Sequence, residues 1–152
     1  MRLLLFFCLS FFMLYAQSVE ITANNFEADD KKKESKFSGN VEINRTNSYI
    51  KTSTLKIFFN DKKKPIKYEA IGDCKFEIET NDKKKYKGVS DKLIYLPFEK
   101  RYEFLGNSYL EEVQDGKKLF ATEIILDEIS GNAIVKGDDK KPLKFIFNLE
   151  EK

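Results

Sequence analysis

Few side chains in this sequence are of the types that carry out catalysis. None of the 152 residues is a histidine, which argues against Ser-His-Asp and Cys-His catalysis, histidine acid–base chemistry and most zinc sites. The chain also has neither a G-x-x-x-x-G-K-[ST] loop nor a G-x-G-x-x-G fingerprint, so nothing supports nucleotide binding. We therefore expect no enzyme, no catalytic residue, no metal site and no cofactor.

Paired carboxylates are the remaining candidates for catalytic chemistry, at Asp29/Asp30 and at Asp138/Asp139. A glycosidase needs two acids that converge on one bond in a groove. Each of these pairs instead adjoins lysines in a polar cluster between apolar runs, which is typical of turns. A hydrolase that works with carboxylates alone is thus a weaker interpretation than a turn role.

Two other residues could undergo chemical modification. Cys74 alternates with Phe76 and Ile78, so we expect a buried, unreactive thiol, because a redox cysteine needs an exposed, cationic setting. Asn44 lies in E-I-N-R-T at 42–46, which contains N-x-T and resembles the acid-extended glycosylation site of some bacterial periplasms. Such short motifs often match by chance, so a modified and an unmodified Asn44 both stay open.

The first sixteen residues, MRLLLFFCLSFFMLYA, differ from the rest of the chain. One arginine, a mostly apolar run and a final small residue predict a signal peptide at 1–16, cleaved after Ala16. A membrane-spanning helix needs about 20 apolar residues, so a retained anchor is the weaker alternative. We expect one exported domain at 17–152, stabilised by its own core, because Cys74 would be its only cysteine.

A repeat organises the remainder of the chain. K-Y-E-A-I-G-D at 67–73 returns as R-Y-E-F-L-G-N at 101–107, and polar N-D-K-K-K clusters at 60–64 and 81–85 are typical of solvated hairpin tips. Glycines followed by Asn or Asp, which suit a positive φ angle or a β-bulge, are Gly39, Gly72, Gly106, Gly131 and Gly137. Apolar residues alternate between these marks, which predicts an all-β fold of repeated antiparallel strands.

The near balance of charge says little about partners. The chain has 27 Lys and Arg against 25 Asp and Glu, so no basic field favours nucleic acid, and we expect none as a partner. The alternating apolar residues are compatible with an ordinary closed core. An interior that holds an apolar ligand is the less favoured alternative when only these residues are considered.

Several segments together resemble a known family. They are V-E-I-T-A-N-N-F-E-A-D at 19–29, F-S-G-N-V-E-I at 37–43, the recurrences A-I-G-D and F-L-G-N, and Y-K-G-V-S-D-K-L-I-Y at 86–95. With the hydrophobic start, this set resembles the LptA/OstA family of periplasmic lipopolysaccharide transport proteins. The resemblance implies a twisted β-jelly roll, open at both ends, whose two sheets form a V around an apolar interior.

The resemblance also implies a ligand, a location and partners. Members of the family form a bridge across the periplasm that carries lipopolysaccharide, with the acyl chains of its lipid A inside. The implied partners are further copies joined head to tail, an inner-membrane LptC-like protein and an outer-membrane LptD-like protein. Because the chain has no nucleotide motif, the driving force must come from another protein.

Two sets of residues follow from this expectation. The expected lipid-binding interior consists of Val41, Ile43, Leu55, Ile57, Phe76, Ile78, Leu93, Tyr95, Phe104, Phe120, Ile124 and Leu126. The expected edge strands for assembly are 19–23, with Val19 and Ile21, and 143–149, with Phe145 and Phe147. The alternative for the second run is a strand that simply closes its own sheet.

Two alternatives to the bridge protein remain. The first is an LptC-like partner of the same pathway, anchored in the inner membrane through an uncleaved start. The second is a structural β-polymer without a lipid ligand, which predicts a tightly filled interior. The filling of the interior is therefore the observation that separates a carrier from a polymer.

Overall fold

The computed structural model describes residues 18–149, and this part of the chain is built from strands without any helix. The strands are β1 (Val19–Thr22), β2 (Asn25–Asp29), β3 (Glu34–Arg45), β4 (Ser48–Phe59), β5 (Pro65–Glu79), β6 (Lys85–Leu96), β7 (Arg101–Glu112), β8 (Lys117–Asp127), β9 (Ala133–Lys136) and β10 (Lys144–Ile146). All pairings are antiparallel. The all-β prediction is confirmed. Within the described residues, no helix exists that could cross a membrane.

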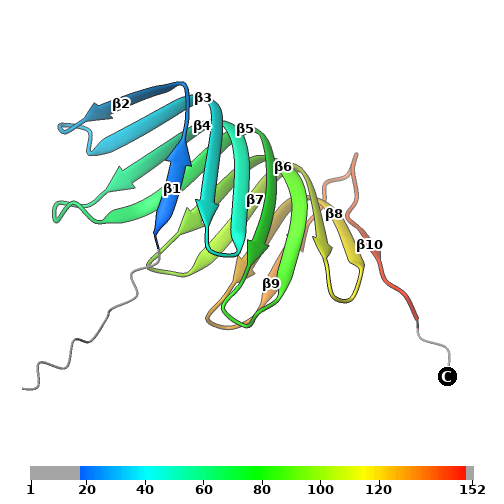
Figure 1. Ribbon diagram of the computed structural model, residues 1–152. Helices are drawn as coiled ribbons and strands as arrows, with labels where there is room; N and C mark the ends of the chain where they lie inside the picture. The colour runs from blue at the N-terminus through cyan, green and yellow to red at the C-terminus, as the bar shows by residue number, and fades with distance from the viewer. Residues whose placement is uncertain (1–17, 150–152) are drawn as a thin grey trace, which may run out of the picture.

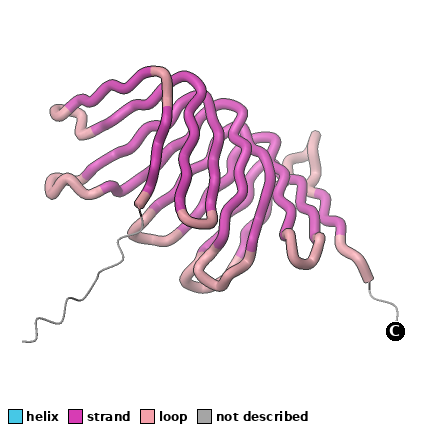
Figure 2. Tube along the Cα trace, viewed as in Figure 1, coloured by secondary structure: helices cyan, strands magenta, loops and turns pink. Residues whose placement is uncertain are grey.

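The strands form one open sheet that follows the order of the chain from β3 to β8 (Figures 1 and 2). At one end, β1 and β2 both pair with β3, and at the other end β9 and β10 both pair with β8. Each end of the sheet is thus a strand broken in its middle. The outer edges of β1 and β2 at one end, and of β9 and β10 at the other, therefore have no partner strand among the described residues.

The long strands bend in their middles, at a row of β-bulges. The pairing register shifts at Gly39-Asn40, Gly72-Asp73 and Gly106-Asn107, and both residues of each dipeptide have a positive φ angle. These glycine corners were predicted from the repeat, and they recur on every second strand. The other two predicted corners differ, because Gly131 lies in the turn after β8 and Gly137 has no positive φ angle.

The bends divide the sheet into two halves. Half A contains β2, β9 and the strand segments 34–38, 54–59, 65–71, 92–96, 101–105 and 123–127. Half B contains β1, β10 and the strand segments 41–45, 48–52, 74–79, 85–90, 108–112 and 117–121. The V-shaped interior predicted by the family resemblance therefore arises from one sheet bent along its middle.

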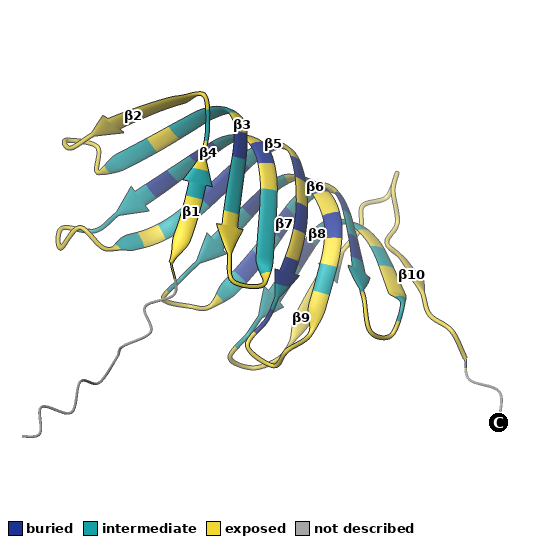
Figure 3. Ribbon diagram, in the orientation of Figure 1, coloured by how far each residue is buried: buried dark blue, intermediate teal, exposed yellow. Residues whose placement is uncertain are grey.

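The two halves pack against each other through their inner faces. The ring of Phe76 in half B lies 4.7 Å, centroid to centroid, from the ring of Phe104 in half A. The main core around them contains Ala70, Cys74, Phe76, Ile78, Leu93, Tyr102, Phe104, Leu110 and Ile124. A smaller core of Val41, Leu55 and Ile57 lies toward β1 and β2. Figure 3 shows this buried stripe along the middle of the bent sheet.

The polar clusters form hairpin tips, as predicted. In the tip at 60–64, the Asn60 side-chain oxygen accepts hydrogen bonds from the backbone nitrogens of Lys62 and Lys64, both at 3.0 Å. Asp29 likewise accepts from the backbone of Lys31 and Lys32 at 3.0 Å. The Asp138 carboxylate caps the turn that follows β9 in the same way. The first aspartate of each acidic pair thus stabilises a turn.

Candidate functional site

A cavity of about 320 Å³ lies between the two halves, toward the β1 end of the sheet. It is lined from half A by Leu55, Tyr68, Ala70, Leu93, Tyr95, Tyr102 and the adjoining Pro97, and from half B by Val19, Ile43, Arg45, Ser48, Ile50 and Ile78. We call this cavity the hollow. Its wall is mostly apolar with a few polar groups, and its volume is at the lower end of the roughly 300–1,000 Å³ typical of ligand pockets.

A ladder of three tyrosines forms one wall of the hollow. Tyr68, Tyr95 and Tyr102 are cross-strand partners on β5, β6 and β7. Their ring centroids are 6.2 Å apart for Tyr68 and Tyr95 and 4.5 Å apart for Tyr95 and Tyr102. Such side chains offer an apolar ring with a polar hydroxyl, so they suit the boundary between an apolar interior and water.

The pKa values of these tyrosines report their surroundings. Burial raises the pKa of Tyr102 most clearly, and the neighbouring Tyr95 and Glu128 act in the same direction. Burial also raises the pKa of Tyr95, while the Arg45 charge and a hydrogen bond from Arg45 oppose that rise. Arg45 belongs to half B and Tyr95 to half A, so these two side chains meet at the rim of the hollow.

The interior is solid on the β7 side of the hollow. Phe76, Phe104 and Ile124 are fully buried there, with Leu110 close to fully buried. Gly88 lies between them on β6, where a Cβ atom would collide with the carbonyl oxygen of Tyr109 and press on the Phe76 ring. We call Phe76, Gly88, Phe104, Leu110 and Ile124 the packed core. The small residue of the Y-K-G motif is thus required by close packing.

Hairpin tips border the open side of the groove in two rows. Half A carries the tips 30–33, 60–64, 97–100 and 128–132, and half B carries 46–47, 80–84 and 113–116. The first two tips of half A project to the left in Figure 1, well away from the half-B tips. At the other end the two rows meet, because Asn81 Nδ2 donates a 3.3 Å hydrogen bond to Glu128 Oε2.

A second cavity, of about 400 Å³, lies between the tips 30–33 and 60–64. Acidic and basic side chains both line it, and Lys33 and Asp61 form an ion pair at its rim. In the part of the chain that the structure describes, no group of three or more His, Cys, Asp or Glu side chains could hold a metal ion. The mixed charge makes this cavity a poorer site for an apolar ligand than the hollow.

Most residues predicted for the interior lie on the inner face of the sheet. Ile43, Tyr95 and Leu126 are partly buried. The buried members are Val41, Leu55, Ile57, Phe76, Ile78, Leu93, Phe104 and Ile124. The residues of this set that line the hollow are Ile43, Leu55, Ile78, Leu93 and Tyr95. Lipid binding by any of these residues stays a prediction.

The interior position predicted for Phe120 is wrong. Its side chain is 37% exposed and pairs with Tyr109 on the outer face, with the Lys144 ammonium 4.8 Å from its ring centroid. Strict alternation from Ile124 points to Phe120, but the bulge opposite Thr122 shifts the register of β8 by one residue. The inner face therefore carries Leu119 at this position.

Sequence reasoning missed several residues of the hollow, among them Tyr68, Ala70 and Tyr102. A signal for them existed, because all three belong to the repeated motif at 67–73 and 101–107. Arg45 and Ser48 lie at the ends of strands beside a tip. No pattern in the sequence singles them out.

The edge predicted at 19–23 is present as β1, the run 143–149 is a strand only at Lys144–Ile146, and the structure adds two more edges. Ile21 of β1 is partly buried against the smaller core, and Val19 of the same strand is exposed and lines the hollow. Phe145 of β10 and Phe147 just beyond it are exposed, with their rings 5.3 Å apart. Because each end strand is broken, β2 and β9 are also edges, and both belong to half A.

Cys74 and Asn44 lie as predicted. Cys74 is fully buried, its sulfur is 3.4 Å from Thr52 Oγ1, and burial raises its thiol pKa. Burial and the raised pKa keep the thiol protonated, while the Thr52 contact acts in the opposite direction. Asn44 is exposed near the end of β3, and its glycosylation stays a prediction.

The bent, open sheet with an apolar groove defines the class of protein as an all-β protein with a groove that can hold a ligand. Comparisons with known proteins identify the family to which the chain belongs. A family model described as LptA/(LptD N-terminal domain) LPS transport protein matches residues 20–132. The chain belongs to this family. No curated protein gives a match.

A solved structure has the same fold. It is LptH from Pseudomonas aeruginosa, described as the LptA homologous periplasmic component of the conserved lipopolysaccharide transport device. The TM-score is 0.73 at 13% sequence identity, and the match covers 88% of this chain and 96% of LptH. The predicted LptA/OstA-type fold, open and without helices in the described residues, is thus confirmed.

Proposed function

We propose that this protein is a periplasmic carrier of lipopolysaccharide that holds acyl chains in the hollow. The observation that carries the proposal is a mostly apolar cavity of about 320 Å³ in a chain that belongs to a family of lipopolysaccharide transport proteins. Exposure of a twelve-carbon acyl chain to water costs about 10 kcal/mol, at roughly 0.8 kcal/mol per CH₂. A carrier therefore needs an interior of this kind.

The unpaired edges supply a means of assembly into a bridge. β1 and β2 at one end, and β9 and β10 at the other, can pair with strands of another chain. The partners we propose are further copies of this chain, head to tail, with an LptC-like protein at the inner membrane and an LptD-like protein at the outer membrane. Deletion of residues 143–152 should leave a folded monomer that no longer oligomerises, as measured by light scattering.

The hollow supports the carrier over the structural polymer. A polymer without ligand needs an interior that is filled throughout, whereas this interior contains the hollow beside its packed core. An LptC-like role would differ in the fate of the first sixteen residues. Both the proposed signal peptide and the alternative anchor lie outside the described residues.

Lipid recovered with the protein tests the proposal. We expect native mass spectrometry of protein purified from lipopolysaccharide-producing cells to show an adduct with the mass of an acylated, phosphorylated glycolipid. Ala70→Phe, which fills the hollow, should lose the adduct. Ala133→Phe should keep it, because Ala133 is exposed and does not line the hollow. A folded wild-type protein that carries no lipid would contradict the proposal.

A further inference from the structure

The hollow is small for the ligand of the proposed function, on which this inference rests. A cavity of about 320 Å³ is at the lower limit for a small ligand. An amphiphile with several acyl chains exceeds it, and the packed core next to it has no room even for a Cβ atom at Gly88. The two halves must therefore move apart before such a ligand can enter.

A contact that joins the two halves opposes this movement. The hydrogen bond of 3.3 Å from Asn81 to Glu128 connects the half-B tip 80–84 with the half-A tip 128–132. Only about 50 Å³ of space remains between these tips, lined by Thr80, Asn81, Asp127 and Glu128 among others. Partial burial raises the pKa of Glu128, which agrees with a carboxylate held between two surfaces.

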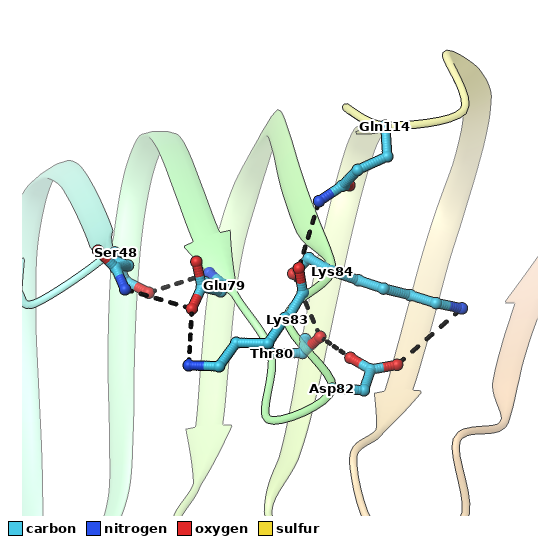
Figure 4. Close-up of polar contacts among 8 residues, drawn as sticks. Ser48, Glu79, Thr80, Asp82, Lys83, Lys84 and Gln114 are labelled. Atoms are coloured by element: carbon cyan, nitrogen blue, oxygen red, sulfur yellow. Dashed lines mark hydrogen bonds and ion pairs between the residues drawn. The ribbon is translucent and has the colours of Figure 1, made fainter.

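The Asn81 backbone also bonds the Glu128 carboxylate, whereas other polar contacts around this tip run along one row and do not cross the groove. Asn47 Nδ2 donates to Glu79 Oε1 at 3.2 Å, and Gln114 Nε2 donates to the Lys83 carbonyl at 3.2 Å. Figure 4 shows Ser48, Glu79, Lys83 and Gln114 linked in this way across neighbouring half-B strands. These bonds stay intact when the halves separate, because both partners belong to half B.

We propose that Asn81 and Glu128 form a clasp that closes the open side of the groove and parts to admit an amphiphile with several acyl chains. The clasp acts on the population of the open state. A ligand that binds only the open state has its apparent affinity reduced by the fraction of molecules that are open. A single-chain ligand fits the hollow with the clasp closed and is indifferent to it.

The matched pair Asn81→Ala and Asn47→Ala tests the clasp, because each removes one asparagine-to-glutamate hydrogen bond of nearly equal length. The ligands are lipid A with several acyl chains and dodecanoate with one. We expect Asn81→Ala to bind lipid A about fivefold more tightly, in keeping with the net value of one hydrogen bond. Its affinity for dodecanoate should be unchanged, and Asn47→Ala should match the wild type with both ligands.

A measurement without ligand separates the clasp from the proposed function. Spin labels on cysteines introduced at Val113 and Ile129, exposed tip residues of half B and half A, report the opening, and the native Cys74 is buried away from the labelling reagent. Asn81→Ala should lengthen the distance between the labels, and Asn47→Ala should not. If Asn81→Ala lengthens this distance while neither lipid A nor dodecanoate binds, the clasp stands and the carrier function fails. If lipids bind but the two variants behave alike in both assays, the clasp is wrong and the carrier function stands.

Discussion

The hollow and the packed core occupy the same groove and derive from the same repeat, yet one is empty and the other is solid. The repeats K-Y-E-A-I-G-D and R-Y-E-F-L-G-N place Ala70 and Phe104 at equivalent positions, on strands β5 and β7. Ala70 lines the hollow, whereas the Phe104 ring fills the space against Phe76. The bent backbone therefore fixes the shape of the groove, and side-chain size at one repeat position helps to fix its capacity.

The largest effect should come from removal of the ring that fills the packed core. Phe104→Ala leaves a cavity among fully buried neighbours and should lower the free energy of unfolding by about 3–5 kcal/mol. Ile43→Ala, at the edge of the hollow, should cost only about 1 kcal/mol, because Ile43 is already partly exposed. Denaturant unfolding measures both, and equal losses would remove the distinction between the two regions.

A small added group should sharpen the contrast. Gly88→Ala forces a Cβ atom into the Tyr109 carbonyl and should cost about 1–3 kcal/mol of unfolding free energy. Ala70→Val adds two methyl groups beside empty space and should change stability by less than about 0.5 kcal/mol. The same unfolding assay applies, and a larger cost for Ala70→Val would mean that the hollow is not open to additional atoms.

The repeat and the bends could be predicted from the sequence, whereas the emptiness of the hollow could not. Glycine followed by Asn or Asp has a local conformational cause, so Gly39, Gly72 and Gly106 were identifiable as corners. Strict alternation failed at Phe120, because a bulge changes which residues face inward.

The clasp and the hollow depend on relations that a single strand does not contain. Asn81 and Glu128 are 47 residues apart and meet only because the sheet twists until its two rows of tips touch. The hollow depends on which side chains from both halves face each other across the groove. Short sequence motifs do not show which residues of distant strands come into contact.

A pH-dependent effect should report burial at the wall of the hollow. The folded protein raises the pKa of Tyr102, mainly through burial. A raised pKa stabilises the folded state below the unfolded value of about 10, and that contribution is lost as the pH rises above it. Stability should thus fall between pH 9 and pH 11 by about 1 kcal/mol more in wild type than in Tyr102→Phe. Parallel pH profiles of the two proteins would contradict this.

A pair of neighbouring substitutions tests which face of β8 is inside. Phe120→Ala should cost less than about 1 kcal/mol, because its ring lies on the outer face and is partly exposed. Leu119→Ala should cost about 2 kcal/mol, because Leu119 packs against the main core. Thermal unfolding of the two variants measures these losses of stability. A larger loss for Phe120→Ala than for Leu119→Ala would place Phe120 in the interior.

Photo-crosslinking at Ile50 and Lys51 in cells that make lipopolysaccharide tests the central claim most directly. Ile50 lines the hollow, while its neighbour Lys51 is exposed and lies on the outer face of β4. A photo-reactive amino acid at position 50 should form adducts with lipopolysaccharide, and one at position 51 should not. Adducts at neither position in a folded, exported protein, or at 51 alone, would contradict acyl-chain binding in the hollow.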